Sequence, residues 1–169
     1  ALCDKYKIMW IADEVMSGFG RTGKWFAYQH SSVVPDLITF AKGVTSGYIQ
    51  LGGVVISKDI SHTFDDKVFA GGLTYMGHPM ACATAVATID VMKEEKMLEN
   101  ATMIGETILG PGLAELAKKH KVIGDIRGAG VFWGVDLVSD RATHEPLAAY
   151  GGSSPAMNEL VAACKKNGL

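Results

Sequence analysis

The sequence predicts an α/β fold with a mostly parallel sheet, followed by a smaller unit that mixes helices and strands. Residues 8–15 and 37–41 are near-continuous apolar runs, the pattern of parallel strands that are buried on both faces. A helix rich in small residues is expected at about 80–92. Farther along, residues 122–127 and 131–138 read as two strands joined by a glycine-containing turn, a hairpin pattern.

Length and composition fit a globular protein. The chain has 169 residues, of which 48% are apolar and 20% charged. A net charge of −2 without a lysine or arginine run argues against nucleic acid or an anionic membrane as a partner. No segment approaches the roughly 20 apolar residues that span a bilayer. Cys3, Cys82 and Cys164 are odd in number and far apart, which favours reduced thiols and a cytoplasmic protein.

Two of the predicted strands end on opposite charges. Asp13 closes residues 10–12, and Lys42 closes residues 37–41. The ligand crevice of an open α/β sheet lies outside the carboxyl ends of its strands, so neighbouring parallel strands would place both side chains in one crevice. There they could hold a pyridine aldehyde, with Asp13 on the ring nitrogen and Lys42 as a Schiff base on the aldehyde carbon. This pairing predicts a site for pyridoxal 5'-phosphate (PLP).

Each of the two charged residues also has an ordinary interpretation. Asp13 could cap a helix or pair with an arginine, and most lysines lie on solvated faces. An ionised carboxylate at the end of a buried strand needs a cation beside it, however, and a protonated pyridine nitrogen is such a cation. A lysine that ends a buried apolar strand loses solvation, which leaves its amine nucleophilic, as Schiff-base formation requires.

The glycine-rich stretch 18–23 also satisfies the G-x-G-x-x-G pattern of dinucleotide-binding loops, so a nucleotide-binding module is an alternative. Such a loop should follow its strand directly, open a helix, and be answered by an acid that ends the next strand. Here four residues intervene after Asp13, and residues 24–30 have no helical period. The nearest acid, Asp36, begins a strand. The context therefore disfavours a nucleotide site.

Several motifs stand in a familiar order along the chain. They occupy residues 12–15, 18–23, 35–43, 47–53 and 74–79. Together they resemble the class III (omega) aminotransferases, which have the type I PLP-dependent transferase fold. Members of that family are longer, so the resemblance implies a fragment: residues 1–96 as part of the PLP-binding large domain, with a mostly parallel sheet, and residues 97–169 as part of a small α+β domain.

The resemblance also implies roles for two further residues. Val15 would pack against the cofactor ring. Thr74 would hydrogen-bond the cofactor phosphate of the neighbouring subunit, which implies a homodimer with shared active sites. The alternative for Thr74 is a simple cap at the entry of the helix that begins near Pro79. We interpret His78 as structural, because no second ligand stands at metal-binding spacing and no metal is expected.

The implied reaction is the transfer of an amino group from an amine or amino acid to a keto acid such as pyruvate or 2-oxoglutarate. Lys42 would hold the cofactor and then move a proton at the substrate carbon. An aminomutase or racemase on the same fold is the alternative. Because site residues of the family lie outside this segment, we expect these 169 residues alone to bind the cofactor poorly and to turn over little.

The last third of the sequence carries further structural predictions. A helix from residue 98 should break at Gly110–Gly112 and resume through Lys119, because proline disrupts a helix interior. Residues 139–154 read as a long polar loop. Ser154 and Pro155 should open a final helix that Gly168 caps.

Overall fold

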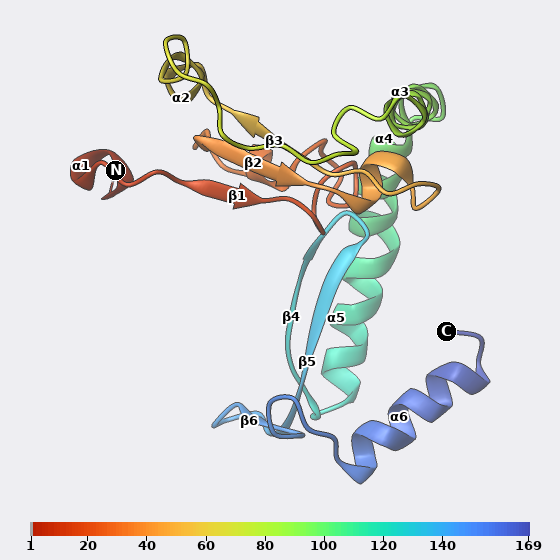
Figure 1. Cartoon of the computed structure of the whole chain (residues 1–169). Helices are drawn as coiled ribbons and strands as arrows, with labels where there is room; N and C mark the ends of the chain where they lie inside the picture. Colours follow the sequence, from red (N-terminus) through yellow and green to blue (C-terminus); the bar gives the residue numbers. More distant parts are fainter. Residues whose placement is uncertain (1) are drawn as a thin grey trace.

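The computed structural model describes residues 2–169 and arranges them around two small sheets that a long helix connects (Figure 1). The first sheet has the order β1-β2-β3. Its strands are β1 (Ile11–Asp13), β2 (Leu37–Phe40) and β3 (Gly53–Ile56), preceded by the short helix α1 (Leu2–Tyr6). β1 and β2 are parallel, as predicted, with Asp13 opposite Thr39. β3 runs antiparallel to β2.

The prediction that the first two strands are buried on both faces is wrong for the described chain. Ile38 of β2 is buried, but Ile11 of β1 is 56% exposed, as is Val54 of β3. The strands are also shorter than the apolar runs that predicted them. The apolar pattern indicates strands that are suited to burial on both faces. Residues 2–169 cover only part of the apolar surface of these strands.

Helix α3 (Pro79–Glu94) lies against the turn that carries Lys42, the 3₁₀ segment η2 (Lys42–Thr45). Pro79 stands in its first turn, as expected from the fixed φ of proline. Ala81 and Ala85 are buried in the helix, and their small side chains permit a close approach to η2. Ala83 and Ala87 are exposed, so only the part of the small-residue pattern formed by Ala81 and Ala85 lies on the packed face.

The predicted helix break at Gly110–Gly112 is wrong. Helix α4 (Met97–Ile104), a π-helical turn η3 (Gly105–Leu109) and helix α5 (Gly110–Lys119) form one continuous rod (Figure 1). The amide of Gly110 donates to the carbonyl of Gly105, five residues back. This wider turn accommodates Pro111, which lacks an N–H, without ending the helix.

The second sheet stands beside α5 and has the order β4-β5-β6. Its strands are β4 (Ile123–Ala129), β5 (Phe132–Asp140) and the two-residue β6 (Glu145–Pro146). β4 and β5 form the predicted antiparallel hairpin, with Ala129 opposite Phe132. The loop predicted at 139–154 is interrupted, because β6 pairs with the end of β5.

The remaining helices are short or lie at the end of the chain. They are η1 (Ala27–His30), α2 (Lys58–His62) and α6 (Pro155–Lys166). The hydroxyl of Ser154 caps α6 by accepting from the amide of Met157, and Gly168 follows with φ +87°, so both predicted ends of this helix are confirmed. None of the helices within residues 2–169 is both long and apolar enough to cross a bilayer.

Candidate active site at the strand ends

Asp13 is the last residue of β1, and hydrogen bonds fix its carboxylate. Oδ1 accepts from the backbone amide of Val15 and from the hydroxyl of Thr39, both at 3.1 Å. Both bonds are made by Oδ1, which leaves Oδ2 able to bind a further donor. Asp13 is exposed at the end of the strand. The carboxylate is therefore oriented by the protein and still accessible to a ligand.

Lys42 lies two residues after the end of β2, and its backbone takes an unusual conformation. Its φ is +46°, in the left-handed region that non-glycine residues rarely adopt. Its Nζ lies 2.7 Å from the thioether sulfur of Met16. No aspartate or glutamate within residues 2–169 forms an ion pair with it. Lys42 is therefore exposed, and its amine forms no ion pair with a carboxylate of residues 2–169.

The two predicted site residues lie at the same edge of the parallel pair. Asp13 contacts Thr39, which lies three residues before Lys42. Lys42 in turn contacts Met16, which lies three residues after Asp13. These reciprocal contacts tie the carboxyl ends of β1 and β2 together. The edge thus carries one carboxylate and one amine, a donor set that can meet a ring nitrogen and an aldehyde.

The other two predicted residues differ in their surroundings. Val15 is half-buried, and its amide donates to Asp13. Thr74 is exposed, in the turn before α3, and forms no hydrogen bond within residues 2–169. The chain therefore brings Val15 to Asp13 but does not bring Thr74 into contact with either charged residue.

Glu14 is a structural residue that the sequence prediction missed. It is only 2% exposed, and its carboxylate accepts from the backbone amides of Ala27 (2.9 Å) and Tyr28 (2.7 Å) and from the hydroxyl of Ser17. Three donors offset the cost of burying a charge. The available signal was a second acid directly after the strand-end acid. Its bonds hold the loop that leaves β1.

The glycine-rich stretch 18–23 does not open a helix, as its sequence context predicts. It forms turns in which Gly20 and Gly23 have φ of +87° and +84°. The loop instead contacts the second sheet, where the amide of Val131 donates to the carbonyl of Arg21 at 3.0 Å. A Cβ on Gly20 would meet Leu98 and one on Gly23 would meet Thr102, so these two glycines let the loop pack closely against α4.

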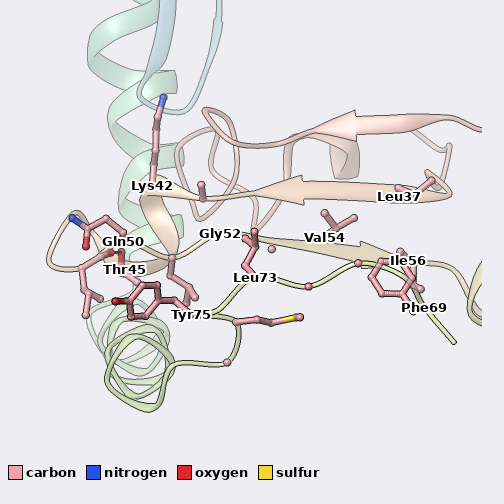
Figure 2. Close-up of a pocket in the computed structure, with 18 of the residues that line it drawn as sticks. Leu37, Lys42, Thr45, Gln50, Gly52, Val54, Ile56, Phe69, Leu73 and Tyr75 are labelled. Atoms are coloured by element: carbon pink, nitrogen blue, oxygen red, sulfur yellow. Dashed lines mark hydrogen bonds between the residues drawn. The ribbon is translucent and has the colours of Figure 1, made fainter.

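Two hollows border Lys42. The larger, of about 1360 Å³, lies between β3 and the segment before α3 and is lined mostly by apolar groups such as Val54 and Leu73. Figure 2 shows the amine of Lys42 directed away from Leu73 and Tyr75. The smaller, of about 630 Å³, is lined by the glycine-rich loop, Asn100 and Val131. Within residues 2–169, no cluster of three or more His, Cys, Asp or Glu side chains could hold a metal ion.

Comparison with known proteins identifies the family. The family model "Aminotransferase class-III" matches residues 1–169. The chain belongs to this family. It is 42% identical over 174 residues to a taurine–pyruvate aminotransferase of Bilophila wadsworthia, covering 99% of this chain and 37% of that protein. It is 43% identical over 171 residues to a 5-aminovalerate aminotransferase of Pseudomonas aeruginosa, covering 100% and 37%.

Solved structures agree with the family assignment. The taurine:2-oxoglutarate aminotransferase of Bifidobacterium kashiwanohense, in complex with PLP and glutamate, matches with a TM-score of 0.93 and 45% identity over 99% of this chain and 37% of that one. A Bacillus anthracis aminotransferase matches at 0.89 and 36%, with the same coverage. The chain thus has part of the PLP-dependent transaminase fold and spans about 37% of the length of these relatives.

Class III aminotransferases depend on PLP, and the residues of this chain fit that cofactor. The fit rests on the donor set: an amine that forms no ion pair and a carboxylate with one oxygen available, at the ends of adjacent parallel strands. The amine suits the aldehyde, and the carboxylate suits the protonated ring nitrogen. The cofactor predicted from the sequence is therefore supported by both the family and the geometry.

Proposed function

We propose that the chain carries the lysine and the ring-binding acid of an aminotransferase that moves an amino group from an amine or amino acid to a keto acid such as pyruvate or 2-oxoglutarate. The observation that carries this proposal is the pairing of Asp13 and Lys42 at one edge of β1 and β2. The aminotransferases among its relatives support the reaction class.

Each side chain of the site has a distinct task in this proposal. Lys42 would bond to the cofactor and later move a proton at the substrate carbon that bears the nitrogen. Asp13 would hold the proton on the ring nitrogen, and Val15 would pack against the ring. When bound, PLP supplies an electron sink for charge that develops at that carbon. Both strand ends are fixed by the loop bonds of Glu14 and Asp13, so little reorganisation is needed.

Thr74 is assigned to a site shared between two copies of the chain. Its exposed position and its lack of a hydrogen bond within residues 2–169 leave its hydroxyl available to the cofactor phosphate of a partner subunit. A homodimer with shared sites is therefore part of the proposal. We also retain the division into residues 1–96 of a cofactor-binding domain and 97–169 of a small domain, and a cytoplasmic location.

The donor is proposed to be a compound with a primary amine at the end of its carbon chain. Taurine and 5-aminovalerate, which are named for relatives of this chain at 39–43% identity, share that chemistry. The acceptors named for the relatives are pyruvate and 2-oxoglutarate. A small panel of these compounds therefore covers the proposed reaction.

The test is a transamination assay, with added PLP, of the natural protein that contains these 169 residues, because the 169 residues alone are expected to turn over little. Taurine and 5-aminovalerate serve as donors, pyruvate and 2-oxoglutarate as acceptors, and the alanine or glutamate that forms is measured. We expect one pairing to give product, and Lys42→Ala to abolish it. Product formation that persists in Lys42→Ala, or an amine rearranged without any acceptor, would contradict the proposal.

A further inference from the structure

The amine of Lys42 lies against a methionine rather than an acid. Sδ of Met16 is 2.7 Å from Nζ of Lys42, across 26 residues of sequence. A thioether sulfur is a weak hydrogen-bond acceptor. It can therefore limit where the amine lies without forming the ion pair that a carboxylate would form. Met16 is 45% exposed, so core packing does not explain its position.

Met16 is itself held in place by the bonds of its loop. The amide of Gly18 donates to the carbonyl of Glu14 at 2.9 Å, which closes a turn around Met16. The carboxylate of Glu14 is in turn bonded to the amides of Ala27 and Tyr28. The thioether is thus presented from a fixed turn.

The same loop restrains the backbone next to Lys42. Gly43 approaches Phe19 so closely that a Cβ on Gly43 would lie 2.9 Å from the Cβ of Phe19. Lys42 keeps its left-handed φ of +46° directly before this contact. Residues 16–19 therefore contact the region of Lys42 at two points. Phe19 packs against Gly43, next to the backbone of Lys42, and Met16 contacts its amine.

We propose that Met16 is a positioning residue for Lys42, which keeps the amine within reach of the substrate carbon from which it moves a proton. The inference rests on the proposed function of Lys42. Productive proton transfer needs the reacting atoms within about 3–3.5 Å of each other, so an amine that swings freely spends less time in reach. Loss of the side chain that lies against the amine therefore slows the proton step and leaves substrate binding unchanged, whereas a side chain of similar bulk preserves the proton step.

The first test needs no turnover and uses the cofactor-free protein. A trace of acetic anhydride labels the lysines, and mass spectrometry compares Lys42 with Lys58, an exposed lysine of α2. In Met16→Ala we expect Lys42 to be labelled about threefold faster or more, because one side of the amine is uncovered. Met16→Leu, which keeps most of the bulk, should restore the wild-type rate, and Lys58 should not change.

The second test uses the natural protein that contains these 169 residues and separates kcat from KM with taurine and pyruvate. Met16→Ala should lower kcat about tenfold while the KM for taurine stays within about twofold. Taurine deuterated at the carbon that bears the nitrogen should show a larger isotope effect in this variant, because proton transfer limits the rate more. Met16→Leu should recover most of kcat.

Several results would overturn the inference. These are equal labelling of Lys42 in wild type and Met16→Ala, a leucine variant that behaves like the alanine variant, or a raised KM with unchanged kcat. If Met16→Ala does not fold, Met16→Val serves as a second truncation. Failure of the proposed function can be told apart from failure of this inference. If the proposed function is wrong, the wild-type protein lacks Lys42-dependent turnover. The labelling of Lys42 still decides whether Met16 positions its amine.

Discussion

The two sheets of the molecule are stabilised in different ways. The β4–β5 hairpin pairs along nearly its whole length, and the side chain of Arg141 donates to the carbonyls of Ala117, His120 and Ile123, which ties the sheet to the end of α5. The β1–β3 sheet has strands of three or four residues with exposed apolar side chains. The proposed site of Asp13 and Lys42 lies at the β1–β3 sheet.

The difference teaches that loop hydrogen bonds, more than a sheet core, fix the candidate site. Glu14 holds the loop after β1, and the carboxylate of Asp36 accepts from the amide of Trp10 at 2.8 Å where the two strands begin. Oriented groups of this kind are already in place when charge develops in a reaction. The hairpin carries ion pairs instead, which lie on the surface.

The largest expected effect comes from Asp13→Asn. The amide oxygen can still accept from Val15 and Thr39, so the loop should keep its shape, but the charge beside the ring nitrogen is lost. We expect kcat to fall about 100-fold or more, with Tm within about 2 °C of wild type. Steady-state kinetics and thermal melting measure the two quantities.

Thr39→Val is the matched control for Asp13→Asn. It removes one hydrogen bond to the carboxylate and leaves the charge, so we expect kcat to fall by less than about tenfold. An Asp13→Asn enzyme with near wild-type kcat would show that orientation, and not charge, is what the site requires.

Gly130→Ala should be the most damaging change at the contact between the two sheets. Gly130 has φ +56°, and a Cβ there would lie 2.5 Å from the backbone carbon of Thr22 and 2.7 Å from the backbone nitrogen of Gly23. Backbone atoms cannot move aside as a side chain can, so we expect a loss of about 2–3 kcal/mol in the free energy of unfolding by urea.

Gly112→Ala is the control for Gly130→Ala. A Cβ on Gly112, inside α5, would have no atom within 4 Å, so this variant should stabilise the protein by about 0.5–1 kcal/mol. Equal effects of the two variants would refute this account of the contact.

Glu14→Gln tests whether the hydrogen bonds of the loop after β1 stabilise the fold around the candidate site. The NH2 group of glutamine would place a donor against the backbone amide of either Ala27 or Tyr28, while the remaining oxygen accepts from the other, so we expect a loss of about 2 kcal/mol in the free energy of unfolding. Glu159→Gln, on an exposed face of α6, should leave stability unchanged. A neutral Glu14→Gln would mean that the loop is held by other contacts.

The smallest effect is expected in the hairpin. A hydrogen bond donated by Arg127 lowers the pKa of Asp125 below its ordinary 3.8, and the hydrogen bonds that Arg127 donates to Asp136 and Asp125 raise the pKa of Arg127. A carboxyl whose folded pKa is depressed stabilises the fold above its unfolded pKa, and this contribution is lost as pH falls through the folded pKa. The relevant window is therefore below pH 3.8. Because these side chains are exposed to solvent, screening keeps the effect small.

Carboxyl titration by NMR tests the hairpin prediction. In Arg127→Gln the pKa of Asp125 should rise toward its ordinary value, and the difference in Tm from wild type should shrink in acid. An Asp125 that titrates identically in both proteins would show that the ion pair does not persist in solution.

Local sequence signals predicted much of the fold. The parallel β1–β2 pair, the β4–β5 hairpin, Pro79 at the start of α3 and the caps of α6 follow from apolar runs, turn glycines and capping residues near them in sequence. Such features depend on neighbours within a few residues, which is why a single sequence reveals them.

The features that the sequence did not reveal depend on distant partners. A Cβ on Gly105 would clash with the backbone of Gly130, so the π-helical turn that begins there packs against the hairpin, a contact that proline rules cannot foresee. β6 exists because β5 offers it an edge. The partners of Glu14 lie 13 and 14 residues away along an irregular loop. The contact of Met16 with Lys42 spans 26 residues.

The most direct test of the central claim is to locate the cofactor on the chain. The protein is incubated with PLP, reduced with borohydride to fix any lysine-bound cofactor, digested, and mapped by mass spectrometry. We predict that the cofactor's mass is found on Lys42, and that Lys42→Arg leaves no lysine labelled above background. Attachment to a different lysine, or unchanged labelling in Lys42→Arg, would contradict the assignment of the site to the ends of β1 and β2.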